Sequence, residues 1–179
     1  EYEDNIITQK TEFTPNGKIS KSTLFKYNWE TIIDYDKCPR EHFFIVYNDK
    51  KEIESKTLTY ISKDDLVIKK VFFNSENKIT ATEEFDYDNS KRLIKEINNG
   101  IVICLNEYFD QQLKKTSYNS NSEIINTYIV DYDSHGNEIM WRKYDAKNKL
   151  YKLKKYYYND LNQLVKKVST KGLTEIITL

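Results

Sequence analysis

One seven-residue pattern recurs along the chain, and a clear copy of it is Tyr158-Asn159-Asp160-Leu161-Asn162-Gln163-Leu164. An aromatic residue opens the pattern, polar turn residues follow, and an aliphatic residue closes it. Self-similarity of this kind marks a repeat protein, in which each unit is stabilised by its neighbours. Further copies follow at steps of roughly thirteen residues and occupy 13–19, 47–53, 60–66, 73–79, 87–93, 118–124 and 144–150, with one extra residue in the copy at 132–139.

The middle of the pattern predicts a hairpin turn. Asp or Asn in the second position can accept a hydrogen bond from the backbone two residues on, and Gly or Asn in the fifth position tolerates a left-handed conformation. We therefore expect a short loop with a bulge between two strands. At Lys51, Asp64 and Lys91 the fifth position suits the turn less well, and we expect some of those loops to differ. The fifth-position residues that fit best are Gly17, Asn77, Gly136, Asn148 and Asn162.

Between the turns, each unit leaves a segment of strand length. Residues 124–130 are rich in β-branched side chains and residues 149–158 in aromatic ones, which favours strands. Because a tight turn closes each unit, consecutive strands must pair antiparallel with their sequence neighbours. No segment combines helical apolar spacing with helix start and stop signals.

The two faces of each predicted strand are not cleanly separated into apolar and polar. In 150–158 both faces carry Lys and Tyr, a pattern that suits a sheet one layer thick, since Lys stems can cover ring surfaces while the ammonium stays in water. The prediction is an all-β fold, an antiparallel up-and-down meander of about a dozen strands. We expect the sheet to be curved and largely single-layer or folded over on itself.

The repeat predicts one β-repeat domain over residues 1–179, with irregular units around 28–46 and 97–113. Within the second of these, Asn99-Gly100 marks a tight two-residue hairpin. Irregular units can carry function or only close an edge, and both interpretations stay open. Cys104 lies in an apolar strand and is expected to be a small buried hydrophobe, whereas Cys38 lies in a loop; a Cys38–Cys104 disulfide is the alternative.

The charge composition limits the kinds of partner that the chain can be expected to bind. Lys and Arg number 28 and so do Asp and Glu, so the net charge is zero and we expect no nucleic-acid partner. No apolar run is long enough for a transmembrane helix. The chain begins at Glu1 and not at Met, which fits either removal of a leader or a segment of a longer sequence. We expect an extracytoplasmic location (periplasm, cell surface or secreted), with the cytoplasm as the alternative.

The sequence offers little catalytic chemistry. His42 and His135 are far apart, no zinc-ligand spacing occurs, and four glycines cannot form a Gly-rich phosphate loop. His135 is expected to be a solvated turn residue. Acidic turn residues such as Asp133 are better explained by turn geometry than by calcium binding. We therefore predict a protein that is not an enzyme and has no catalytic residue, metal or cofactor.

Aromatic side chains are concentrated near the C-terminal end of the chain. Aromatic residues on a sheet can stack on sugar rings or anchor a protein partner. The alternative is that they pair with one another across strands and stabilise the sheet. The residues that we predict to bind a partner are Trp141, Tyr144, Tyr151 and Tyr157.

Tyr132-Asp133-Ser134-His135-Gly136-Asn137 resembles the YD repeat of Rhs-type proteins, as does Tyr144-Asp145-Ala146-Lys147-Asn148-Lys149-Leu150. The resemblance extends in degenerate form over most of the chain. It implies a bacterial protein, usually secreted or surface-associated, of a family whose long β-sheets form hollow shells around a toxin. This chain departs from the family because Gly is usually missing, the step is shorter and the length could not close a shell.

These observations lead to one hypothesis and two alternatives. The first is a non-enzymatic bacterial β-repeat module that binds a protein or glycan partner through a sheet face, at the cell surface or in the periplasm. The alternatives are an immunity-type protein that neutralises a partner toxin, and a structural repeat segment of a larger Rhs-like protein.

Overall fold

The computed structural model describes residues 2–3, 6–7, 9–26, 29–171 and 174–178. Every regular secondary-structure element among these residues is a β-strand, which confirms the all-β prediction. Contacts between Cα atoms divide the chain into two compact units. The first consists of Glu1–Lys91 with Asn98–Gly100, and the second of Arg92–Ile97 with Ile101–Leu179.

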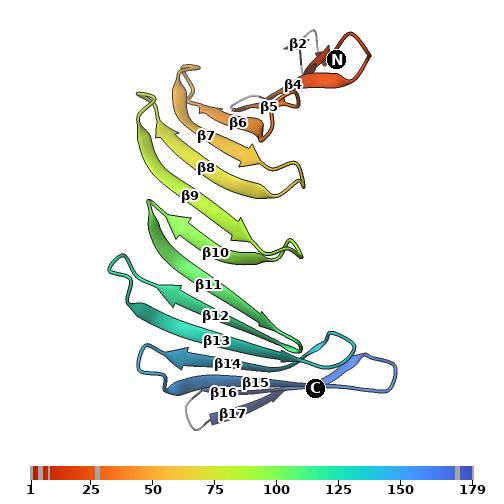
Figure 1. Cartoon of the computed structure of the whole chain (residues 1–179), viewed down its shortest axis with the longest axis vertical. Helices are drawn as coiled ribbons and strands as arrows, with labels where there is room; N and C mark the ends of the chain where they lie inside the picture. The colour runs from red at the N-terminus through yellow and green to blue at the C-terminus, as the bar shows by residue number, and fades with distance from the viewer. Residues whose placement is uncertain (1, 4–5, 8, 27–28, 172–173, 179) are drawn as a thin grey trace. The chain divides into compact units, whose positions relative to one another are not determined.

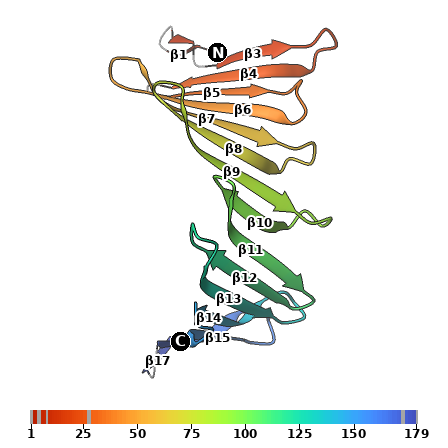
Figure 2. The ribbon, with the colours of Figure 1, turned by 60° about the vertical axis from the view of Figure 1, so that its left-hand side comes forward.

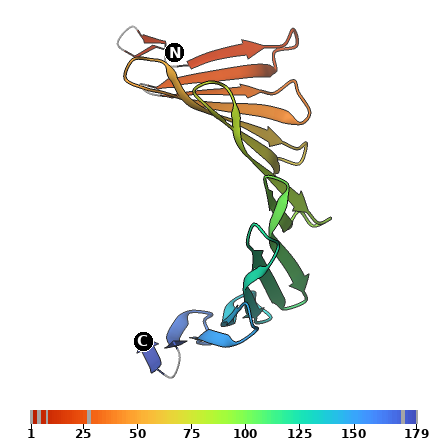
Figure 3. The ribbon, with the colours of Figure 1, turned by 90° about the vertical axis from the view of Figure 1, so that its left-hand side faces the viewer.

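The strands of the first unit follow one another in sequence order, and each pairs antiparallel with the next (Figures 1 and 2). Figure 3 shows β3 to β6 side by side. A separate antiparallel pair is formed by β1 (Tyr2–Glu3) and β2 (Ile6–Ile7). The other strands are β3 (Gln9–Phe13), β4 (Ile19–Lys26), β5 (Trp29–Asp34), β6 (Arg40–Tyr47), β7 (Ile53–Ile61), β8 (Val67–Asn74) and β9 (Ile79–Tyr87).

The second unit is built in the same way, again with neighbours in sequence as neighbours in the sheet (Figure 1). The antiparallel meander is thus confirmed within each unit. The described strands exceed the predicted dozen, because the irregular regions also form strands. The strands are β10 (Leu93–Asn98), β11 (Ile101–Phe109), β12 (Gln112–Tyr118), β13 (Ile124–Tyr132), β14 (Glu138–Asp145), β15 (Leu150–Tyr158), β16 (Leu164–Lys171) and β17 (Thr174–Thr178).

The pattern turns share one geometry, which the loop after β14 illustrates. The Asn148 N–H donates to the Asp145 carbonyl oxygen at 3.0 Å, and the Asp145 Oδ1 accepts from the Lys147 and Lys149 N–H groups at 3.0 and 2.9 Å. Asn148 has a φ of 59°, the left-handed conformation predicted for this position. The residues in this position with the same backbone bond are Gly17, Lys51, Asp65, Asn77, Lys91, Ser122, Gly136, Asn148 and Asn162.

Of the three loops among which some were expected to differ, those at Lys51 and Lys91 keep the common geometry, since both residues are left-handed with φ of 61° and 63°. The first residue of the loop explains this: the Asn48 Oδ1 accepts from the backbone of Lys50 and Glu52, both at 3.0 Å. A side-chain acceptor there offsets a strained residue three positions on.

The copy at 60–66 is shifted by one residue from the expected alignment. Its left-handed residue is Asp65 instead of Asp64. Ser62 opens the loop, with the Asp65 N–H donating to its carbonyl oxygen at 3.1 Å. Ile61 therefore occupies the place that an aromatic residue holds in the other copies, and it pairs with Val67.

The register explains the two ends of the pattern. In most copies the opening aromatic residue pairs across the hairpin with the closing aliphatic residue, as Tyr144 does with Leu150, whereas Tyr132 pairs with Glu138. The next pair is Lys143 with Lys152, so Tyr151 is an extra residue, a β-bulge. The same extra position is filled in eight hairpins by Ser20, Glu54, Ile68, Thr80, Ile125, Ile139, Tyr151 and Val165.

Tyrosine has a further role at the opening position. The Tyr87 hydroxyl donates to the Val67 carbonyl oxygen at 2.8 Å, and the Tyr158 hydroxyl donates to that of Glu138 at 3.0 Å. In each case the acceptor lies at the start of the preceding strand, so the ring ties two strands together.

Each sheet is one layer thick, as predicted. The strands contact their sequence neighbours, and most described side chains are half-buried on both faces. Among the described residues, no side chain is less than 2% exposed. The few buried residues lie near strand centres and are Thr23, Leu58, Val71, Cys104, Thr116, Val130 and Val168.

The irregular regions form hairpins of other types. Asn99 and Gly100 have φ of 48° and 80°, which confirms the predicted two-residue hairpin between β10 and β11. Residues 35–39 connect β5 and β6 and include a cis peptide bond before Pro39. Cys104 is buried as expected, and Cys38 is exposed; both are free thiols, so the alternative of a disulfide between them is wrong.

Candidate functional site

A groove of about 400 Å³ lies on one face of β13 to β15 in the second unit. Its lining combines aromatic rings with lysine side chains and includes no Asp, Glu, Asn or Gln. The lining residues are Tyr128, Trp141, Lys143, Tyr151, Lys152 and Lys154. We call this the aromatic–lysine groove, and the sheet face that carries it the groove face.

Strand register brings these side chains together. Tyr128 pairs with Lys143, Lys143 pairs in turn with Lys152, and Trp141 pairs with Lys154. Because alternate residues of a strand share a face and directly paired residues share it too, these five side chains project to one side.

Tyr151 reaches the groove for a different reason. Strict alternation from Lys152 and Lys154 would place residue 151 on the opposite face. Tyr151 is instead the extra residue of the bulge, and bulges re-aim side chains. Its ring lies under the Lys143 ammonium, with Nζ at 5.3 Å from the ring centroid.

The rings and ammonium groups are interleaved. Tyr128 and Trp141 have centroids 5.3 Å apart with planes tilted by 48°. The Lys143 Nζ lies 4.7 Å from the Tyr128 centroid, and the Lys154 Nζ lies 4.6 Å from that of Trp141. Such contacts contribute about 0.5–1 kcal/mol each at exposed sites, so part of this arrangement stabilises the sheet itself.

The lysines of the groove lack acidic partners. Among the described residues, no carboxylate oxygen lies within 4.0 Å of the Nζ of Lys143, Lys152 or Lys154. Lys143 and Lys152 are directly opposite each other, and like charges in that relation are destabilising. The backbone register continues this row to Lys171 in β16.

The lysine pKa values reflect these surroundings. Burial, followed by the positive charges of Lys167 and Lys152, lowers the pKa of Lys154. By contrast, the neighbouring Tyr128 and Tyr151 side chains raise the pKa of Lys143. The groove therefore contains a cation held by aromatic neighbours beside one that is crowded by other cations.

The structure brings together two of the four residues predicted to bind a partner. Trp141 and Tyr151 line the groove. Tyr144 pairs with Thr127 and Tyr157 with Lys166, which places both on the face opposite the groove. Whether any of the four contacts a partner stays a prediction.

Sequence reasoning missed the lysines and Tyr128. A net charge of zero for the whole chain concealed a local excess: residues 138–171 hold ten Lys and Arg against three Asp and Glu. A running charge count along the chain is the signal that could have found them. Tyr128 was present in the β-branched segment 124–130, but only the register shows that it lies beside Trp141.

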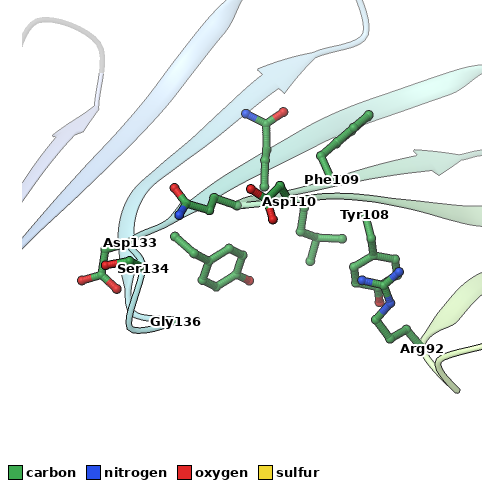
Figure 4. A pocket seen from close by; sticks show the side chains of 11 residues that line it. Arg92, Tyr108, Phe109, Asp110, Asp133, Ser134 and Gly136 are labelled. Atoms are coloured by element: carbon green, nitrogen blue, oxygen red, sulfur yellow. The ribbon is translucent and has the colours of Figure 1, made fainter.

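A second groove, of about 460 Å³, lies at the hairpin ends of β11–β12 and β13–β14 (Figure 4). The Arg92 guanidinium stacks on the Tyr108 ring at 4.3 Å, and Asp110 and Asp133 supply carboxylates. The Asp133 Oδ1 is already used by the turn, where it accepts from the backbone of His135 and Asn137, both at 2.9 Å. Turn geometry thus accounts for much of this groove.

The histidines and acidic residues form no other site. His135 is exposed in its turn, as predicted, and His42 is half-buried on β6, where burial lowers its pKa. In the part of the chain that the structure describes, no group of three or more His, Cys, Asp or Glu could hold a metal ion. The same residues include no helix long and apolar enough to span a membrane.

No protein-family model matches the chain, and no curated protein matches it. Among solved structures, it is similar to a chain of the crystal structure of TcdB2-TccC3-Cdc42, with a TM-score of 0.32 and 10% identity over 95% of this chain and 13% of that one. It is also similar to a chain of the Photorhabdus luminescens Tc holotoxin pore with the TccC3 mutation D651A, with a TM-score of 0.27 and 12% identity over 94% of this chain and 9% of that one. Likenesses of this degree define neither a family nor a function.

Proposed function

We propose that this chain is a non-enzymatic β-repeat module that binds a protein or glycan partner through the aromatic–lysine groove. The observation that carries the proposal is the gathering of Trp141, Tyr128 and Tyr151 with three unneutralised lysines on one face of a single-layer sheet. Aromatic side chains with polar surroundings are typical anchors of binding interfaces.

The ring contacts of this arrangement stabilise the sheet, but the pairing of its lysines does not. Lys143 directly opposite Lys152 opposes folding, and the other hairpins reach the same backbone geometry with unlike residues in these positions. Residues that cost stability without a structural gain are candidates for function.

The test is a binding screen against arrays of glycans and of bacterial surface proteins, with Trp141→Ala as the probe variant. The first unit supplies a matched control, because Trp29 also contacts a ring, that of Phe44 at 5.6 Å, and a lysine, Lys26 at 5.2 Å. We expect a partner whose binding is lost in Trp141→Ala and kept in Trp29→Ala. Equal binding by the wild type and Trp141→Ala would refute the proposal.

A structural role within a longer repeat protein is the second candidate. The uniform turn geometry favours it, since a scaffold needs regular units more than a site. The complete coding sequence tests it: continuation of the same pattern beyond this chain would support a scaffold. An upstream signal sequence would support the proposed extracytoplasmic location.

A further inference from the structure

The charge of this chain is segregated along the sequence. Residues 138–171 carry ten Lys and Arg against three Asp and Glu, a net charge of +7, and the remaining residues carry eighteen against twenty-five, a net charge of −7. A protein of zero net charge thus presents a strongly basic stretch in β14 to β16. Local fields of this kind raise the association rate of oppositely charged partners.

Within this stretch, the groove lining has no carboxylate, although the register places Glu138 and Asp145 on the same face of β14. Arg142, on the opposite face of β14, is neutralised by Asp131, with Nη2 at 2.7 Å from Oδ1. Lys143, Lys152 and Lys154 on the groove face have no described carboxylate within 4.0 Å of Nζ. The groove therefore offers cationic hydrogen-bond donors that the protein itself leaves unneutralised.

The ring faces in the groove are already occupied. The ammonium groups of Lys143 and Lys154 lie over Tyr128, Tyr151 and Trp141. A neutral sugar needs an open ring face and side-chain acceptors for its hydroxyl groups, and a nucleobase needs an open ring face for stacking. A sugar fits poorly because the groove lining contains no amide or carboxylate, and both ligands fit poorly because ammonium groups lie over the rings.

We propose that the aromatic–lysine groove binds an acidic, Asp- and Glu-rich segment of a partner protein, whose carboxylates contact Lys143, Lys152 and Lys154. This inference rests on the proposed function and specifies its partner. Lys152 and Lys154 are two residues apart on β15, so their Cα atoms are separated by about 6.6 Å. Alternate residues of an extended peptide have the same spacing, so a strand-like acidic segment along β15 places one carboxylate at each ammonium.

The tyrosine and tryptophan rings then act as walls. They keep the lysine stems upright and reduce the water around the ammonium groups, which strengthens charge-assisted hydrogen bonds to carboxylates. A carboxylate between Lys143 and Lys152 also relieves the repulsion that the register imposes. The bound carboxylate thus neutralises positive charge that the folded chain leaves unpaired at Lys143 and Lys152.

The experiment measures binding of fluorescently labelled poly-L-glutamate to the full chain by polarisation. The test variant is K143E/K154E, and K155E/K166E is the matched control, since it makes the same charge change on the same or neighbouring strands of the opposite face. We expect the test variant to weaken binding by about tenfold or more and the control by about twofold. K143Q/K154Q, which adds no negative charge, should weaken binding by a smaller factor, and circular dichroism confirms folding of each variant.

Three further probes separate the outcomes: polygalacturonate, dextran and a thymidine oligonucleotide. Poly-L-glutamate binding that is equal in the test and control variants overturns the inference, as does its absence. Binding of polygalacturonate or dextran that Trp141→Ala abolishes, without binding of poly-L-glutamate, overturns the acidic-peptide inference but supports the proposed function. Tighter binding of the oligonucleotide than of poly-L-glutamate overturns both, because it makes nucleic acid the partner.

Discussion

Lysines in β8 and lysines in β14 and β15 occupy sheets of the same construction but have different neighbours. Lys69 pairs with Glu84 and Lys70 with Glu83, with Nζ–Oε distances of 2.9 and 3.7 Å. In the second unit, Lys154 lies opposite Trp141, and Lys143 lies opposite Lys152. The backbone geometry therefore does not dictate how a lysine is neutralised.

The difference indicates where the chain departs from the arrangement that best serves its stability. Opposite charges paired across strands contribute about 0.2–1 kcal/mol, and like charges cost a similar amount. The β8–β9 pairs of the first unit take the favourable arrangement, although they are exposed and worth little individually. The second unit retains an unfavourable one in its groove, which is the physical basis of the proposed function. The following predictions test whether the contrast is one of charge alone.

Packing should be equivalent in the two units. Val71 in β8 and Val130 in β13 are 6% and 7% exposed. We expect Val71→Ala and Val130→Ala each to lower the free energy of unfolding by about 2 kcal/mol, from lost apolar burial and an incompletely filled cavity. Urea denaturation measures this, and the fluorescence of Trp29 or Trp141, retained singly in a Trp→Phe background, reports on each unit. A cost below about 0.5 kcal/mol in only one unit would mean that packing differs as well.

Turn strain is the next largest effect. Gly136 has a φ of 83° and open space where a Cβ would lie, so Gly136→Ala should cost about 1 kcal/mol through backbone strain alone. Lys51 has the same conformation with a side chain already present. Lys51→Gly should stabilise the first unit by about 0.5 kcal/mol, because relief of strain exceeds the added freedom of the unfolded chain. Thermal unfolding of both variants checks the signs, and destabilisation by Lys51→Gly would contradict this account.

The turns also show how far the sequence determines the fold. Polar first residues and Gly or Asn in the fifth position predicted most hairpins, and Asn99-Gly100 predicted its own. The copy at 60–66 was misaligned by one residue because the aromatic residue was used as the marker, whereas Ser62 opens the loop. Lys51 and Lys91 showed that the first residue, through its side-chain acceptor, outweighs the preference of the left-handed position.

The groove was only partly predictable. Aromatic density identified Trp141 and Tyr151, but the face on which each side chain lies depends on the register. One extra residue reverses the facing of every residue beyond it. The residues at the bulge positions range from Ser20 and Glu54 to Ile68 and Tyr151, so no single residue type marks the position. Alternation along β14 already separates Tyr144 from Trp141. The face of Tyr157 relative to Trp141 is set by pairing across strands, which no local pattern encodes.

Removal of single charges should have opposite signs in the two units. Glu84→Gln breaks an exposed ion pair and should cost about 0.5 kcal/mol. Lys152→Gln removes a cation that faces Lys143 and should stabilise the second unit by about the same amount. Urea denaturation with the two single-tryptophan backgrounds measures each effect in its own unit. Destabilisation by Lys152→Gln would indicate that the ammonium is neutralised within the folded chain, and would remove the basis for an anionic partner.

Added salt should change the free energy of unfolding by only a few tenths of a kcal/mol, the smallest effect predicted here. It compares the two units most directly, because it acts on the attraction in one and on the repulsion in the other. Raising the salt concentration from about 0.1 M to about 1 M shortens the Debye length from about 10 Å to about 3 Å. The Lys69–Glu84 attraction weakens, so the transition reported by Trp29 should shift to lower urea concentration. The Lys143–Lys152 repulsion also weakens and opposes the loss of the second unit's ion pairs, such as Arg142–Asp131. We expect the relief of repulsion to dominate, so the transition reported by Trp141 should shift to higher urea concentration.

Sodium chloride is the suitable salt, because sulfate strengthens apolar burial in both units and would mask the difference. Lys152→Gln provides the internal control, since it should abolish most of the salt response at Trp141 and leave that at Trp29 unchanged. Equal salt shifts at Trp141 in the wild type and in Lys152→Gln would show that the groove cations are balanced in the folded chain. Opposite signs would instead show that repulsion between the groove cations outweighs the ion pairs of the second unit, a repulsion that an external anion would relieve.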